Sequence, residues 1–223
     1  MNTPYAPSLT LRAARDLYFA ANKFGADGGY SSPWVDFKLG PIPMPFPNSS
    51  GRVRAVRFHD LHHILTGYAT DTLGEFDISA WELGAGCKDF YAAWQLNLTA
   101  LATGMIVSPR RMLHAFRRGR RSESLYGRDL EEILARTVGE MREECGVDRP
   151  IDPGEAHLSD YPRLAAAWAA GILVGLVIIV PMITVAGPLL FIAGRLRGAT
   201  SPGLSSTPSS TPGDTLVDSA SPR

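Results

Sequence analysis

Residues 59–75 read HDLHHILTGYATDTLGE, and the interpretation of the whole chain depends on this stretch. It contains four potential metal ligands: His59, Asp60, His63 and Glu75. If residues 59–66 are helical, the two histidines lie one turn apart on one face, a spacing at which two imidazoles can bind one cation. Gly67 is well placed to end that helix, so that the chain can turn and bring the glutamate back from a second helix. The stretch therefore predicts a divalent metal site.

Two simpler interpretations of the same stretch involve no metal. Residues Thr72 to Glu75 have the form of a capping box, in which both side chains only satisfy free N–H groups at a helix start. His62 has no place in the predicted site and is a candidate for a solvated side chain. Spacing alone does not choose between the metal site and these alternatives.

The motif HDxxH, followed by eleven residues and a glutamate, resembles the signature of the Coq4 family of ubiquinone-biosynthesis proteins. The likeness covers residues 52–147, through an apolar segment to GRR at 119–121 and LARTVGEMREECGV at 134–147. The apolar C-terminal stretch lies outside that pattern. The resemblance implies that zinc is bound by the four matching residues, His59, Asp60, His63 and Glu75, which would also form the catalytic site.

The same resemblance implies a function in the biosynthesis of a quinone ring. The implied substrate is a polyprenylated hydroxybenzoate in the bilayer, and the implied reaction is removal of the ring carboxylate at C1, coupled to hydroxylation at that carbon. Such an enzyme is a lyase of the decarboxylase type. The resemblance also implies a scaffolding role with other quinone-biosynthesis proteins. Two nitrogens and two oxygens would accept iron or manganese as well as zinc, so the ligand types leave the metal open.

Two other functions are compatible with these residues. An HD-type phosphohydrolase would use His59 and Asp60 as its metal pair, but all five histidines lie from His59 onward, and the missing upstream histidine counts against it. A non-enzymatic scaffold that binds prenyl lipid would use the motif only to stabilise its fold. Small residues interleaved with aromatics in residues 72–105 suit either close core packing or a cavity for an isoprenoid tail.

The composition limits the class of protein. The chain has 223 residues, 45% of them hydrophobic, and a formal net charge of zero, which suits one domain with an appendage and gives no general attraction to nucleic acid. Cys87 and Cys145 have neither metal-ligand spacing nor the density of a disulfide framework, which suits a reducing compartment. The N-terminus has no continuous apolar segment, so no secretory signal is expected and the domain is placed in the cytoplasm. A homo-oligomer remains open.

Hydrophobic spacing predicts an all-α domain over residues 1–160. The expected elements are a helix over 9–24 closed by Gly25, a proline-rich loop over 28–50, one or two helices over 72–105 with a break at 84–86, and a single helix over 129–145. The five prolines of the loop are expected to block both helix and sheet pairing.

A basic segment follows these apolar helices. Residues 109–121 read PRRMLHAFRRGRR, with six arginines around three apolar side chains. Such a helix can lie on an anionic membrane surface, where each arginine contributes on the order of 1 kcal/mol. The alternative is a solvated face that is balanced by the acidic residues that follow.

The C-terminal part of the chain predicts a membrane anchor. Residues 164–194 are an uncharged run of 31, bracketed by Arg163 and Arg195, whereas a span needs only about 20. Trp168 is expected at one interface, and Pro181 favours one tilted or kinked span over a re-entrant hairpin. Residues 195–223 are rich in Ser, Thr and Pro and are expected to be disordered.

Overall fold

The computed structural model describes residues 4–35, 38–39, 42–43, 46–149, 158–181, 184–185 and 189. Within these ranges the chain is mostly helical, which confirms the predicted all-α class for this part of the molecule. The C-terminal tail that was expected to be disordered, 195–223, lies outside the described residues.

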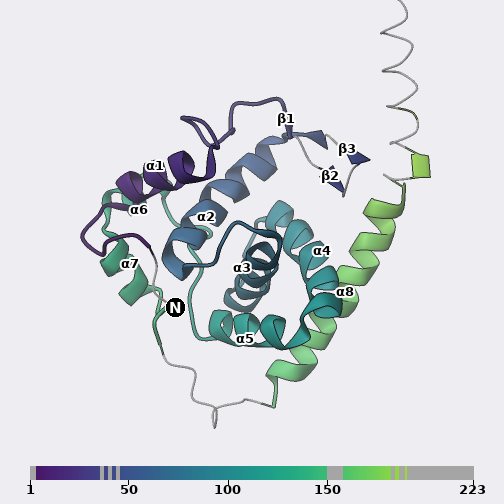
Figure 1. The fold of residues 1–223 in the computed structure, drawn as a ribbon. Coiled ribbons are helices and arrows are strands. Elements are labelled where there is room, and N and C mark those ends of the chain that lie inside the picture. The colour runs from purple at the N-terminus through teal and green to yellow at the C-terminus, as the bar shows by residue number, and fades with distance from the viewer. Residues whose placement is uncertain are drawn as a thin grey trace, which may run out of the picture.

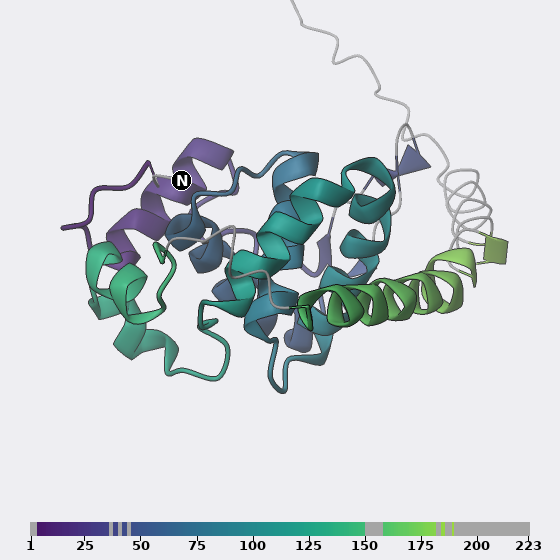
Figure 2. The same cartoon turned by 90° about the horizontal axis from the view of Figure 1, so that it is seen from below.

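Helix α3 lies at the centre of the described domain. The helices are α1 (Leu11–Asn22), α2 (Ser50–Thr66), α3 (Thr72–Ala85), α4 (Tyr91–Val107), α5 (Pro109–Arg120), α6 (Leu130–Ala135), α7 (Val138–Glu144) and α8 (Asp160–Pro181). Helix α3 packs along α5 and α4, whereas α1, α6 and α7 gather on the far side of α2 (Figure 1). Helix α8 lies against the outer side of α4 and extends beyond the domain, as the view from below shows (Figure 2).

In the turn between α2 and α3, the end of α2 forms as predicted and the start of α3 does not. Gly67 ends α2 in the left-handed conformation, with φ 73°, which confirms its predicted role. Helix α3 is capped by Asp71, whose carboxylate accepts from the Gly74 N–H. The interpretation of Thr72 to Glu75 as a capping box is therefore wrong. Because Asp71 serves the helix start, the Glu75 side chain is left for other contacts.

The segment 129–145 forms two short helices, so the prediction of one helix is wrong. Helix α6 ends before Arg136, whose backbone is extended, and Thr137 starts α7 with a capping box to Glu140. The interruption lets the main chain pair with the segment before α1, because the Val138 N–H donates to the Leu9 carbonyl. The apolar stripe itself is buried as expected, at Ile133, Leu134, Met141 and Cys145.

The proline-rich loop contains short strands, contrary to the prediction that its prolines block sheet pairing. Trp34–Val35 (β1) pairs antiparallel with Phe46–Pro47 (β4), and Lys38–Leu39 (β2) pairs with Ile42–Pro43 (β3). Both pairings are only two residues long, and proline is tolerated at such strand ends because its missing N–H need not face a partner. Helix α1 also ends earlier than predicted, because Lys23 adopts the left-handed conformation.

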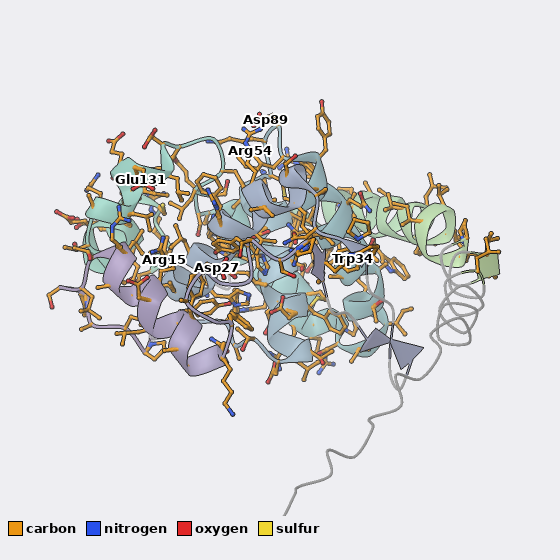
Figure 3. All side chains as sticks on the ribbon, turned by 90° about the horizontal axis from the view of Figure 1, so that it is seen from above. Arg15, Asp27, Trp34, Arg54, Asp89 and Glu131 are labelled. Carbon is orange, nitrogen blue, oxygen red and sulfur yellow. The ribbon has the colours of Figure 1, made fainter. Side chains whose placement is uncertain are left out.

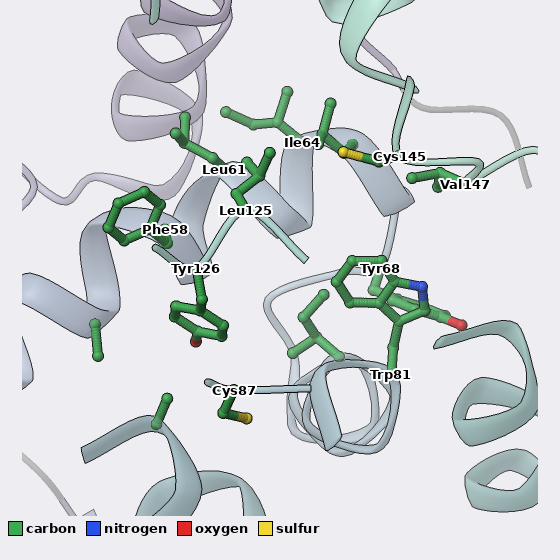
Figure 4. Close-up of a cluster of buried hydrophobic side chains, with 14 of the residues drawn as sticks. Phe58, Leu61, Ile64, Tyr68, Trp81, Cys87, Leu125, Tyr126, Cys145 and Val147 are labelled. Atoms are coloured by element: carbon green, nitrogen blue, oxygen red, sulfur yellow. The ribbon is translucent and has the colours of Figure 1, made fainter. Parts of the chain in front are cut away.

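Small residues let the central helices approach closely. A Cβ on Gly119 of α5 would overlap the Trp81 carbonyl oxygen of α3, and one on Gly84 would overlap the Phe116 carbonyl oxygen. Aromatic and aliphatic side chains of α2 and α3 fill the core beside this contact, including Phe58, Leu61, Ile64 and Trp81 (Figure 4). Within 72–105, Gly84 therefore serves helix packing, one of the two uses expected for the small residues of this segment.

The arginine-rich helix α5 is tied to the rest of the domain. Four of its five arginines have partners on other segments: Asp77 for Arg111, the Thr66 and Val147 carbonyls for Arg118, and Asp160 for Arg117 and Arg120. Arg118 is buried, and it caps the C-terminal carbonyl groups of α2. These arginines therefore hold helix ends in place, a use that neither of the two expectations for this segment included.

Helix α8 contributes to the packed domain. The Leu164 side chain is buried, the Trp168 indole N–H donates to the Ala102 carbonyl at 3.4 Å, and Gly171 lies directly against the Leu98 carbonyl of α4. Among the described residues, Asp160–Ile178 is the one helical segment that is long and apolar enough to cross a membrane. The expected C-terminal apolar helix is thus present up to Pro181, and its first turns pack on α4; most of the run from 182 to 194 lies outside the described residues.

Candidate metal centre

Three of the four predicted ligands converge between α2 and α3. His59 and His63 project from one face of α2, with their Nε2 atoms 3.1 Å apart. Glu75, in the first turns of α3, places Oε2 3.3 Å from the His59 Nε2 and Oε1 3.4 Å from the His63 Nε2. The helix, the glycine stop and the returning glutamate thus bring two nitrogens and one carboxylate together.

The distances between these donor atoms fit one small divalent ion. Zinc binds imidazole nitrogen and carboxylate oxygen at about 2.0–2.2 Å, and two such donors around a tetrahedral centre are separated by roughly 3.3 Å. The two Nε2 atoms lie 3.1 Å apart, and each lies 3.3–3.4 Å from a different Glu75 oxygen. One donor atom from each of the three residues lies within 4.8 Å of the other two. The residues present therefore fit the metal that the sequence motif implies.

Both ring orientations direct Nε2 toward this point. The His63 Nδ1–H donates to the Tyr68 carbonyl at 3.0 Å, so the lone pair of neutral His63 is on Nε2. The Tyr18 ring stacks on the same imidazole, with centroids 5.9 Å apart. The His59 Nδ1–H donates to the Glu82 Oε1 at 2.9 Å. A hydrogen bond of this kind at the far nitrogen sets the tautomer of a metal-binding histidine.

Glu82 is a functional residue that the sequence interpretation missed. Its side chain is buried and accepts four hydrogen bonds, from His59 and His62 at Oε1 and from Asn97 and Tyr126 at Oε2. The partners come from α2, from α4 and from the segment before α6. Glu82 lies seven residues after Glu75, which is two helical turns, so both carboxylates share one face of α3. That spacing is the signal in the sequence that would have identified it.

His62 is a buried structural residue, so the alternative of a solvated side chain is wrong. Its Nδ1–H donates to the Glu82 Oε1 at 2.7 Å, and its Nε2 accepts the Leu125 N–H at 2.8 Å. Because Nε2 accepts, this imidazole is neutral. Burial lowers the pKa of His62, in agreement with that assignment. His62 therefore joins α2 to the segment before α6 and binds no ion.

Asp60, the fourth predicted ligand, has its hydrogen-bond partners outside the three-residue cluster. Its buried carboxylate accepts from the Tyr30 hydroxyl at 2.5 Å and from the Tyr18 hydroxyl at 3.4 Å. Burial raises the pKa of Asp60. The three residues whose donor atoms all lie within 4.8 Å of one another are His59, His63 and Glu75, among the residues that the structure describes. Asp60 instead anchors the loop that carries Tyr30.

The charges around the cluster favour a cation. Burial opposes a charge on His59, but the carboxylates of Glu82 and Glu75 raise its pKa well above the ordinary value. Burial alone would raise the pKa of Glu75, whereas hydrogen bonds from His59 and His63 lower it to about 2. The Glu75 side chain is 42% exposed, so the cluster opens to solvent on that side. A proton on His59 and a metal ion would compete for the same place.

Comparison of the chain with protein families, curated proteins and solved structures finds no match.

Proposed function

We propose that this chain is a membrane-attached, metal-dependent protein of quinone biosynthesis that acts on the ring of a polyprenylated hydroxybenzoate. The observation that carries the proposal is the convergence of His59, His63 and Glu75 with the mutual donor separations that one ion requires. The resemblance of residues 59–75 to the Coq4 signature supplies the substrate and the reaction. The proposed reaction replaces the C1 carboxylate by a hydroxyl group: carbon dioxide leaves, one oxygen atom of dioxygen enters at C1, and two electrons from a donor outside this chain reduce the other oxygen atom to water.

In this chemistry the protein's side chains bind the metal ion and orient its ligands. When bound, the metal ion supplies a Lewis acid for a carboxylate or phenolate oxygen of the ring. His59 and His63 offer nitrogen donors whose directions are set by Glu82 and by the Tyr68 carbonyl. Three protein ligands leave coordination positions open, as in catalytic zinc sites. The half-exposed side of Glu75 is where a ring would approach.

Two histidines and one carboxylate suit more than one metal. This set occurs in catalytic zinc sites and also in ferrous oxygenases. Zinc has no redox chemistry, so a zinc form can assist loss of carbon dioxide but needs a separate oxidant system for hydroxylation. Because Asp60 is bound by Tyr30 and Tyr18, the site has three donors where the motif offers four. Zinc remains the metal that we propose, with iron or manganese as alternatives to be compared directly.

The alternative functions differ in what they require of Asp60 and of the metal. A phosphohydrolase would need His59 and Asp60 to bind metal together, and the hydrogen bonds from the two tyrosines to Asp60 favour the three-residue site instead. A scaffold that presents prenyl lipid would retain metal and lipid but release no product. Organisation of partner enzymes is compatible with either the catalytic or the scaffolding function.

The decisive experiment measures product with the purified full-length chain. Metal-free protein in detergent is reconstituted separately with zinc, ferrous iron or manganese and incubated aerobically with a polyprenyl-hydroxybenzoate. Mass spectrometry distinguishes loss of carbon dioxide alone from loss of carbon dioxide with gain of oxygen. We expect product from at least one metal form and none from His63→Ala. Absence of product from every metal form, with metal and prenyl lipid retained, would establish the scaffold; phosphate release from nucleotides would establish the hydrolase.

Membrane attachment completes the proposal. The substrate's polyprenyl chain remains in the bilayer, and the C-terminal apolar run to Gly194 supplies an anchor of sufficient length. We propose a single pass with the metal-binding domain on the cytoplasmic side. Extraction of membranes with carbonate, followed by protease protection of the domain, tests both the anchoring and the orientation.

A further inference from the structure

The exposed side chains of α8 are small before Gly171 and large after it. Before this residue, the α8 side chains of residues 164–170 that face solvent are alanines: Ala165, Ala166 and Ala169. After it, they are large aliphatic side chains: Ile172, Leu173, Leu176, Val177 and Val180. One continuous helix therefore has a first part with little apolar surface exposed and a second part with much.

The first part of α8 belongs to the packed domain. Leu164 is buried, and Trp168 and Gly171 contact the main chain of α4 at Ala102 and Leu98. The close approach at Gly171 leaves no room for a larger side chain, because a Cβ there would overlap the Leu98 carbonyl oxygen. Lipid cannot surround these turns without separating α8 from α4.

We infer that the bilayer begins at Ile172, so that α8 is a domain helix up to Gly171 and a membrane helix after it. This inference rests on the membrane attachment proposed above and specifies which residues enter the lipid. Residues 172–194 carry no charge. At ~1.5 Å per residue these 23 residues reach roughly 34 Å, which exceeds the ~30 Å thickness of the hydrocarbon core. The packed turns are therefore not needed for the span.

A lipid bilayer fits this surface better than a second copy of the chain. The exposed large apolar side chains do not end with α8, because Val185 and Leu189, which lie beyond it, are exposed as well. The uncharged run continues to Gly194 and is followed at once by Arg195 and Arg197, which suits a boundary between hydrocarbon and headgroups. Trp168, which donates to α4, is then a packing residue and no interface anchor.

This arrangement fixes the metal centre relative to the membrane. The helix that leaves the bilayer continues into the domain without a linker and contacts Leu98 of α4. The neighbouring residue, Asn97, donates to Glu82, and Glu82 orients His59. The domain therefore has one preferred orientation on the membrane, set by the α4–α8 contact.

Two cysteine substitutions seven residues apart test the boundary. Ala166→Cys and Leu173→Cys lie two turns apart on the same side of α8, and both native cysteines are buried. Glu131→Cys is the control, because Figure 3 places Glu131 at the end of the molecule opposite α8. The full-length variants are reconstituted in vesicles of equal parts phosphatidylcholine and phosphatidylglycerol. Labelling by a membrane-impermeant maleimide is measured relative to denatured protein and normalised to the Glu131→Cys control.

We expect Ala166→Cys to react as Glu131→Cys does and Leu173→Cys to react at least about tenfold more slowly, because the aqueous reagent does not enter the hydrocarbon. Equal protection of both α8 positions would overturn the inference, since the span would then begin near Leu164. Full reactivity of Leu173→Cys in vesicle-bound protein would overturn it too. Protection that disappears on dilution into excess lipid would assign the surface to a second copy. Metal content is measured on the same samples. A protein that binds no metal would contradict the proposed metal site without affecting the test of the membrane boundary.

Discussion

Glu82 and His59 are joined by a hydrogen bond of 2.9 Å between the carboxylate Oε1 and the imidazole Nδ1, although they lie on different helices. The carboxylate is held in turn by Asn97 and Tyr126, so it has little freedom to move. Its position therefore determines where the His59 Nε2 points. The candidate metal centre would therefore depend on this buried carboxylate as well as on its proposed ligands.

The first prediction concerns Glu82 as a positioning residue. Glu82→Gln keeps the shape of the side chain but removes the negative charge that orients and polarises His59. We expect the affinity for zinc to fall by about 10–100-fold, the usual effect of altering such a partner. Isothermal titration or chelator competition measures the change, with Glu131→Gln as the exposed control. Unchanged affinity in a folded Glu82→Gln protein would show that His59 needs no such support.

The second prediction separates ligands from neighbours. His59→Ala, His63→Ala and Glu75→Ala should each lose most of the bound metal, because each removes one of three donors. Asp60→Asn should retain it, since Asp60 is bound by tyrosine hydroxyls. Metal analysis after gel filtration measures occupancy, with the exposed His114→Ala as control. Loss of metal from Asp60→Asn equal to that from His63→Ala would restore Asp60 as a ligand.

The third prediction is the pH dependence of metal binding. Burial works against a proton on His59, but Glu82 and Glu75 raise its pKa well above the ordinary value, so the metal-free protein holds this proton near neutral pH. Metal binding must displace it. Affinity should therefore rise with pH through a window that lies above pH 6.5, the ordinary value of the imidazole pKa. Calorimetry in buffers of different ionisation enthalpy should detect release of about one proton per ion at pH 7. Binding without proton release would contradict the assignment.

Local patterns predicted that His59 and His63 lie close together, because such patterns act over one or two helical turns. The spacing of His59 and His63 and the stop at Gly67 are properties of α2 itself, and they form as predicted. Asp60 and His62 are neighbours in the same motif, yet their partners come from Tyr30 and Leu125. These partners lie on other segments, and no spacing rule within the motif identifies them.

The fold shows the same division between local and distant causes. The break between α3 and α4 was readable from the glycines around Gly86. The break between α6 and α7 was missed, although Thr137 and Glu140 form a capping box, because the continuous apolar stripe of 129–145 suggested one helix. A main-chain pairing with the segment before α1 decides that break. Apolar periodicity reports burial, whereas the ends of helices depend on distant partners.

The fourth prediction concerns the contact between α3 and α5. Gly119→Ala places a methyl group against the Trp81 carbonyl, and neither backbone can move without disturbing the core. We expect the free energy of unfolding to fall by about 1–3 kcal/mol, the usual cost of overpacking. Gly51→Ala in α2 is the matched control, because nothing lies within 4 Å of its Cβ position. In the Gly51→Ala protein, the higher helix propensity of alanine should raise the free energy of unfolding by about 0.5–1 kcal/mol. Chemical denaturation measures both, and equal effects would contradict the close packing.

The last prediction concerns where the chain can be cut. A truncation before Arg163 removes Leu164, Trp168 and Gly171, so it exposes the side of α4 that these residues cover. A truncation after Gly171 removes the large aliphatic surface but keeps this contact. Both proteins should leave the membrane on a carbonate wash. Only the longer one should keep the stability of the domain and its metal, because α4 also holds Asn97 against Glu82.

Comparison of the two truncations in one denaturation experiment tests this directly. We expect the shorter protein to unfold at lower denaturant concentration, with a loss of at least about 2 kcal/mol, since burial of one leucine-sized side chain contributes about 1.5–3 kcal/mol. A full-length protein in which Trp168 is replaced, Trp168→Ala, should show an intermediate loss. If the protein cut before Arg163 is as stable as the longer one and binds metal equally well, then α8 contributes only an anchor, and the division of this helix at Gly171 is wrong.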